Sequence, residues 1–145
     1  MRTVPNRSTL MTRELPLPQA SRDNAPFYEA AHRGELRLQR CTVCGTFRHY
    51  PRPACPHCLS RDHTWELSTG RGTVYTWTIV RGPTLPAFEH KLPYNVVDVL
   101  MDEGVHVVSE VLDCAPEEIT AGMPVQATFV RASDDITLVK FRKVP

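Results

Sequence analysis

The chain has 145 residues, of which 41% are hydrophobic and 23% charged, and its formal net charge is +1. This length and composition predict one or two compact units and exclude a chain that is mostly disordered. A charge so close to zero argues against a dedicated nucleic-acid binder, and the absence of an apolar run of about 18 residues predicts no membrane span.

The N-terminal stretch, residues 1–22, is polar, contains three prolines and shows no sustained period, which predicts a flexible or extended lead-in. It lacks the apolar segment of a secretory signal, so we expect a protein of the reducing cytoplasm. A helix is predicted next. Asp23 or Asn24 can cap its start, Pro26 suits its first turn, and Gly34 ends it.

Four cysteines follow as two Cys-x-x-Cys pairs, Cys41 with Cys44 and Cys55 with Cys58, separated by ten residues. Four sulfurs at the corners of a tetrahedron suit zinc. A rubredoxin-like iron site and a pair of disulfides are the alternatives, and nothing in the sequence indicates the secreted context that disulfides prefer. We therefore predict a structural zinc site, closed by four protein ligands, with His57 as a bystander.

The segments around the cysteines have the pattern of a small β-structure. Alternation from 35 to 40 predicts a half-buried strand that leads into the first cysteine pair, and residues 47–50 predict a short returning strand. Trp65 and Leu67 are expected to cover the metal hairpin. We assign residues 23–68 to one unit, made of the helix and a rubredoxin-like zinc ribbon.

The ribbon region is locally basic. Two explanations stand: the cations offset the negative charge that four thiolates leave around one zinc ion, or they bind an anion such as a phosphate group or an acidic partner face. The arginines are Arg33, Arg37, Arg40, Arg48, Arg52 and Arg61, set against Glu29, Glu35 and Asp62.

The second unit, residues 69–145, is rich in β-branched and aromatic residues. Its first strand is expected to place Val74 and the following even-numbered residues on one face, and Tyr75, Trp77 and Ile79 on the other. Five strands with a helical turn between the third and fourth fit an OB-fold, a five-stranded Greek-key barrel, and a β-sandwich is the alternative. The predicted strands are 72–82, 94–101, 105–112, 125–131 and 136–142.

Catalytic motifs are scarce. The sequence contains no Gly-rich phosphate loop, nucleophile elbow or His-x-x-x-His pair. Cys114 could act as an acyl acceptor in an enzyme that works alone, but the neighbouring Asp113 would raise its pKa, and a buried small residue is the simpler interpretation. His90 and His106 have no partner that the sequence identifies. We predict no catalytic residue, and a binding or assembly module.

The order of several short motifs resembles a bacterial and archaeal family of acyl-CoA-associated proteins that join a rubredoxin-like zinc ribbon to an OB-fold. The resemblance covers about residues 15–142, and its four cysteines match the metal site of the family. The motifs are Leu15–Pro18, Pro26–Ala30, Gly34–Leu36, Gln39–Cys58, Gly70–Tyr75 and Gly122–Val125.

The resemblance implies a non-catalytic accessory subunit in a hetero-oligomer with a thiolase-superfamily enzyme: a thiolase, an acyltransferase, a hydroxymethylglutaryl-CoA synthase or a retro-aldolase. The partner would hold the catalytic residues, and the small subunit would stabilise it and help to shape a shared acyl-CoA channel. In the loop 83–93, Phe88 and His90 are our candidates for contact with that channel. The alternative is a nucleic-acid-binding module that uses Tyr75, Trp77 and the ribbon arginines.

Overall fold

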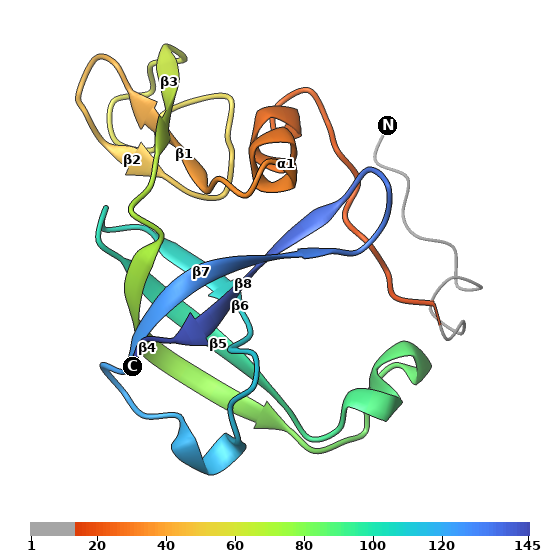
Figure 1. Ribbon diagram of the computed structural model, residues 1–145. Helices are drawn as coiled ribbons and strands as arrows, with labels where there is room; N and C mark the ends of the chain where they lie inside the picture. The colour runs from red at the N-terminus through yellow and green to blue at the C-terminus, as the bar shows by residue number, and fades with distance from the viewer. Residues whose placement is uncertain (1–13) are drawn as a thin grey trace.

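The computed structural model describes residues 14–145, in which a small zinc-ribbon-like sheet stands on one side of a curled β-sheet (Figure 1). Most of the predicted flexible lead-in lies outside the described residues. Residues 14–20 run without helix or strand toward α1, Ala25–His32, which Asn24 precedes with Pro26 in its first turn. The predicted side-chain cap is wrong, because Asn24 Oδ1 accepts a hydrogen bond from the Ser21 N–H instead of from the helix. Gly34, at a φ of 77°, follows the helix as expected.

The first sheet has three strands in the order β2-β1-β3. The predicted strands become β1, Arg37–Cys41, and a shorter β2, Phe47–Arg48, while β3, His63–Leu67, is a strand that the sequence analysis missed. Trp65 pairs with Gln39 of β1 and remains partly buried. The expectation that Leu67 covers the metal hairpin is wrong, because its side chain is 61% exposed at the end of β3.

The second sheet confirms the five-stranded OB-fold. Its strand order is β6-β5-β4-β7-β8, with antiparallel pairing between neighbours. Just after β6, a parallel bridge between Val111 and Phe141 of β8 closes the curled sheet, and the Leu112 N–H donates to the Phe141 carbonyl at 2.8 Å. The strands are β4 Arg71–Val80, β5 Tyr94–Met101, β6 His106–Ser109, β7 Pro124–Arg131 and β8 Thr137–Lys143, with 3-10 helices η2 Pro86–Lys91 and η3 Pro116–Glu118 between them.

A β-bulge in β4 overturns the alternation expected for this strand. Val74 of β4 pairs with Val99 of β5, and the next pair is Thr76 with Asp98. Tyr75 therefore has no partner on β5 and is the extra residue of the bulge. Beyond the bulge, Trp77 stands opposite the buried Val97. Because residues directly opposite share a face, the odd-numbered residues now point toward the barrel, and the even-numbered ones point away.

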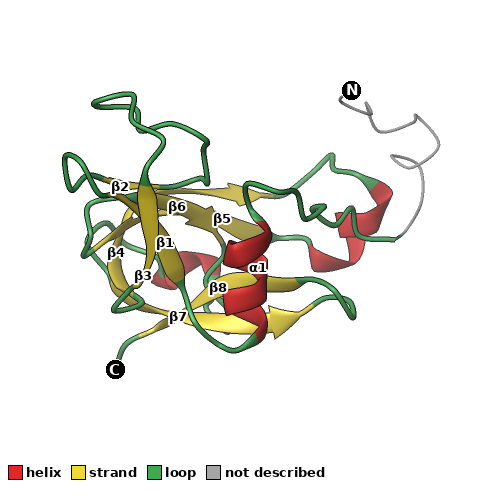
Figure 2. Cartoon of the chain, turned by 90° about the horizontal axis from the view of Figure 1, so that it is seen from above, coloured by secondary structure: helices red, strands yellow, loops and turns green. Residues whose placement is uncertain are grey.

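The ribbon and the barrel share one hydrophobic core. Leu36 and Leu38, which lead into and lie on β1, belong to the same buried cluster as Val97, Val99 and Phe141 of the barrel. Helix α1 lies beside β8, as Figure 2 shows from above. The assignment of separate units at 23–68 and 69–145 remains a prediction, and the packing joins them through this core.

Candidate functional site

The four predicted ligands come together at one end of the ribbon. The sulfur atoms of Cys41, Cys44, Cys55 and Cys58 all lie within 4.8 Å of one another, and two pairs, Cys41 with Cys58 and Cys44 with Cys55, are 3.6 Å apart. Zinc at about 2.3 Å from each of four tetrahedral sulfurs would set them about 3.8 Å apart. No disulfide joins these cysteines, so the donor set fits a four-thiolate zinc site.

Both cysteine pairs are held by the same backbone turn. The Gly45 N–H donates to the Cys41 carbonyl at 2.9 Å, and the Leu59 N–H donates to the Cys55 carbonyl at 3.0 Å. The residue after each second cysteine takes a positive φ, 75° at Gly45 and 63° at Leu59. The first turn therefore has the residue that this conformation favours, and the second does not.

Replacing Leu59 with glycine is expected to stabilise the protein by about 0.5–1 kcal/mol. A left-handed conformation costs a non-glycine residue about 1–2 kcal/mol, part of which the extra freedom of glycine in the unfolded chain cancels. The Leu59 side chain is 77% exposed, so little packing is lost. Chemical denaturation of zinc-loaded protein measures the change. Gly45→Ala makes the opposite change at the equivalent position and should lower the free energy of unfolding. A change of the same sign in both variants would contradict the explanation.

The thiols are electrostatically unequal before a metal binds. The hydroxyl and backbone N–H of Thr46 lower the pKa of Cys44 to about 5. The backbone N–H of Ser60 acts in the same direction on Cys58, but burial and the three neighbouring sulfurs outweigh it and raise the pKa of Cys58 to about 12. A divalent cation removes this conflict, because it stabilises all four sulfurs as thiolates and releases their protons.

The second candidate region is a groove beside η2. Phe88 is half-buried there, with its ring centroid 5.8 Å from that of Tyr94. The groove has a volume of about 650 Å³, and its other walls include Leu17 of the lead-in and Leu138 of β8. His90, the other candidate, is exposed and does not line the groove. The structure thus separates the two residues that the sequence analysis had grouped.

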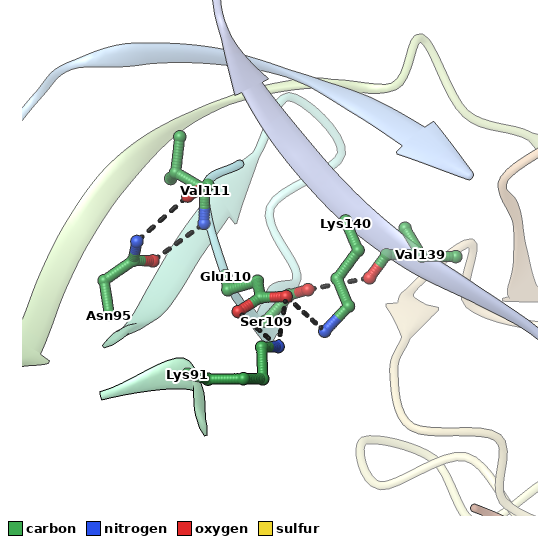
Figure 3. A network of polar contacts seen from close by, with 7 residues as sticks. All are labelled: Lys91, Asn95, Ser109, Glu110, Val111, Val139 and Lys140. Carbon is green, nitrogen blue, oxygen red and sulfur yellow. Dashed lines mark hydrogen bonds and ion pairs between the residues drawn. The ribbon is translucent and has the colours of Figure 1, made fainter. Parts of the chain in front are cut away.

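A charged network that the sequence analysis missed forms the polar part of this groove (Figure 3). Glu110 lies between two lysines, with its Oε1 3.1 Å from both Lys91 Nζ and Lys140 Nζ. Burial disfavours the charged carboxylate, but Lys140 and Lys91 outweigh burial and lower the pKa of Glu110. Next to it, the Asn95 side-chain amide donates to the Val111 carbonyl and accepts from the Val111 N–H. These partners lie on η2, β8 and the end of β6, so no short-range sequence pattern predicts that they meet.

Glu110→Gln is expected to destabilise the protein by about 1–2 kcal/mol at pH 7, because both lysines lose a charged acceptor. The pKa of Glu110 is lowered from its ordinary value of 4.5, so the ion pairs contribute fully above about pH 4.5. Their contribution is lost as the pH falls through the lowered pKa. Urea denaturation measures the free energy of unfolding of Glu110→Gln and of the parent protein. The difference between them should be smaller in acid than at pH 7. Glu89, which is exposed and forms no ion pair within residues 14–145, supplies the control Glu89→Gln. If Glu110→Gln cost as much stability in acid as at pH 7, the assignment would be refuted.

The remaining candidates do not form a catalytic set. Burial raises the pKa of Cys114, Lys143 opposes that shift and Glu118 adds to it. Among the described residues, the Cys114 thiol hydrogen-bonds only to the carbonyl of Ala115, at 3.7 Å, and its side chain packs against the core of the barrel. The imidazole of His106, whose partner no sequence pattern identifies, lies 2.9 Å from the Asp98 carboxylate on the exposed face. Among the described residues, the Cys114 thiol therefore lacks the hydrogen-bonded base that an activated nucleophile needs.

The fold and the four clustered cysteines define a protein with a structural zinc ribbon joined to an OB-fold barrel. Residues 29–64 match the family described as the ChsH2 rubredoxin-like zinc ribbon domain, and residues 65–130 match the ChsH2 C-terminal OB-fold domain. The chain belongs to this ChsH2, or DUF35, family. Membership confirms the expected ribbon-plus-barrel architecture and a structural zinc, and Cys41, Cys44, Cys55 and Cys58 are positioned to bind such an ion.

Similar proteins carry several descriptions. A probable enoyl-CoA hydratase alpha subunit from Thermomonospora curvata is 42% identical over 127 residues, which are 88% of this chain but 39% of that protein. A DUF35 domain-containing scaffold protein from Pyrococcus furiosus is 39% identical over 99 residues, 64% of this chain and 72% of that one. The chain thus spans well under half of the hydratase subunit and most of the scaffold protein.

A solved structure described as an Ltp2-ChsH2(DUF35) aldolase contains a similar chain. The two are 41% identical with a TM-score of 0.79, over 88% of this chain and 98% of that one. Among the described residues, no helix is long and apolar enough to cross a membrane.

Proposed function

We propose that this chain is a non-catalytic accessory subunit of a heteromeric acyl-CoA enzyme complex, in which a thiolase-superfamily enzyme supplies the catalytic residues. The observation that carries the proposal is the match to nearly the whole ChsH2 chain of the Ltp2-ChsH2(DUF35) aldolase structure. A relative described as a scaffold supports the same role. So does the environment of Cys114, because burial raises its pKa and, among the described residues, its thiol hydrogen-bonds only to a backbone carbonyl.

The groove beside η2 is our proposal for the surface that contributes to a shared acyl-CoA channel. Phe88 and Leu138 give it apolar walls, as an acyl or pantetheine chain requires. The pair of lysines around one carboxylate leaves a net positive charge, which favours an anionic substrate. His90 stays a candidate for contact with the partner enzyme, because it is exposed on the same short helix.

Co-expression tests the subunit role. We expect the chain to co-purify with the thiolase-superfamily enzyme encoded nearest to its gene, in a complex whose mass is seen by native mass spectrometry. Recovery of the chain alone in repeated purifications of the native protein would count heavily against the proposal. In an assembled complex, Phe88→Ala should raise KM for the acyl-CoA substrate, whereas Leu67→Ala on the ribbon should leave KM unchanged.

The nucleic-acid alternative rests on the exposure of Tyr75 at the bulge, which is 61%, and of Trp77, which points toward the barrel but keeps 38% of its surface exposed. An OB-fold that binds single strands uses such aromatic side chains as stacking surfaces. Saturable, salt-dependent binding of a single-stranded oligonucleotide at physiological salt would support it. A fluorescence titration without any such binding would remove it.

A further inference from the structure

We propose that a cleft between the start of α1 and the ribbon sheet binds a small, multiply charged phosphate compound. The cleft has a volume of about 380 Å³, and three arginines line it: Arg22 before the helix, and Arg52 and Arg61 on either side of the second cysteine pair. These residues lie far apart in sequence. The fold of the ribbon against α1 brings their positive charges to one hollow.

Among the described residues, the arginines of this cleft differ from most other cations in having no acidic partner. Within residues 14–145, the cations that form no ion pair with a carboxylate are Arg22, Arg48, Arg52, Arg61 and Arg81. Three of these five line the cleft, and Arg48 lies directly behind it. The paired cations are Arg33 and Arg37 with Glu35, Arg40 with Glu66, Arg71 with Asp102, Lys91 and Lys140 with Glu110, Arg131 with Asp134, Arg142 with Asp113 and Lys143 with Glu118.

A buried polar residue connects Arg48 to the wall of the cleft. Gln39 lines the cleft and is almost fully buried, and its Oε1 accepts hydrogen bonds from Arg48 Nε at 2.9 Å and from the Arg52 backbone N–H at 2.8 Å. Arg48 is itself only 3% exposed, and its Nη1 and Nη2 atoms have no hydrogen-bond partner among the described residues. Arg48 forms no ion pair with a carboxylate among residues 14–145, so its charge adds to the positive potential of the cleft.

The arrangement selects the chemistry of the ligand. Guanidinium groups bind phosphate oxygens in a planar, two-pronged geometry, and three of them around a small volume favour an anion with several charges. Asp23 on the wall removes one unit of charge and leaves the cleft positive. Trp65 and Pro26 add apolar surface beside the arginines, so a phosphate ester with an organic group suits the cleft better than a bare ion.

Titration of the full-length, zinc-loaded chain with inorganic pyrophosphate and with ADP, by calorimetry and tryptophan fluorescence, tests this site. We expect saturable binding of both, with ADP the tighter because it also covers Trp65. Arg52→Gln and Arg61→Gln should each weaken binding by about tenfold or more, since each removes a charged hydrogen-bond donor. Arg81→Gln, which removes an unpaired arginine outside the cleft, is the matched control and should bind normally.

Other outcomes would overturn the proposal. Binding that weakens equally in Arg81→Gln would show a non-specific charge effect. If the arginines only offset the thiolate charge, Arg52→Gln would lower the affinity for zinc, and pyrophosphate would not bind to the parent protein. Binding of a single-stranded oligonucleotide at these arginines, with none of pyrophosphate or ADP, would assign the cleft to nucleic acid instead. Circular dichroism and zinc content show whether each variant is folded.

Discussion

Cys41→Ser is expected to lose zinc and to unfold the ribbon. Cys41 is the last residue of β1 and is 1% exposed, so a serine there leaves a buried hydroxyl and an incomplete ligand set. Structural zinc in ribbon-type peptides binds with an apparent free energy of about 10–16 kcal/mol, comparable to the whole stability of a typical domain. Losing one thiolate therefore removes enough free energy to unfold the ribbon. Metal content by plasma mass spectrometry, together with a thermal melt, measures both effects.

The fifth cysteine supplies the control for this substitution. Cys114 is not one of the four clustered cysteines and lies between β6 and η3, so Cys114→Ser should keep one zinc ion per chain and a melting temperature close to that of the parent. A full complement of zinc in Cys41→Ser would contradict the four-thiolate assignment. In an assembled enzyme complex, unchanged activity of Cys114→Ser would also remove the idea of a chain that catalyses through this thiol.

Leu38→Ala is expected to destabilise the protein by about 2–5 kcal/mol, the usual cost of emptying a buried leucine site. Leu38 is 1% exposed and lies on β1 of the ribbon, yet it packs in the core of the barrel. We therefore expect both parts to lose stability together. Hydrogen exchange measured on amides of β1 and of β5 should show similar increases in rate, because one opening event exposes both.

An exposed leucine of the same sheet, Leu67, supplies the control that distinguishes the loss of shared core packing from a general loss of ribbon structure. Leu67→Ala, at the end of β3, should change stability by no more than about 0.5 kcal/mol. If Leu38→Ala were no more costly than Leu67→Ala, the ribbon and the barrel would be independent units. Faster exchange in the ribbon alone would lead to the same conclusion.

The parts of this fold that short-range patterns encode could be predicted from the sequence. The spacing of the cysteines, the proline in the first turn of α1 and the β-branched run of β4 each carry their signal within about ten residues. Strand β3 was missed because His63–Leu67 has no clear alternation, and it becomes a strand only by pairing with β1. The bulge at Tyr75 was missed for a similar reason, since a register shift is a property of two strands and not of one.

The same distinction separates the predicted from the unpredicted parts of the candidate sites. Zinc ligands are recognised by spacing, whereas an arginine in a sequence does not show whether it has a partner. Arg37 finds Glu35 two residues away, but Arg40 finds Glu66 at a separation of 26 residues. The unpaired state of Arg52 and Arg61 could be seen only once every ion pair was placed. The position of Glu110 between two lysines likewise depends on three separate elements.

The contact between α1 and β8 has a consequence for the order of events during synthesis. His32 at the end of the helix lies 3.3 Å from the Thr137 hydroxyl on the last strand, across a separation of 105 residues. Chains emerge from the ribosome N-terminus first, and contacts of such long range form late. All four zinc ligands leave the exit tunnel long before β8 does. We therefore expect the nascent ribbon to acquire its metal while the surfaces of α1 and β1 that pack on the barrel are still uncovered, which makes this interval the one in which the newborn chain most needs a chaperone.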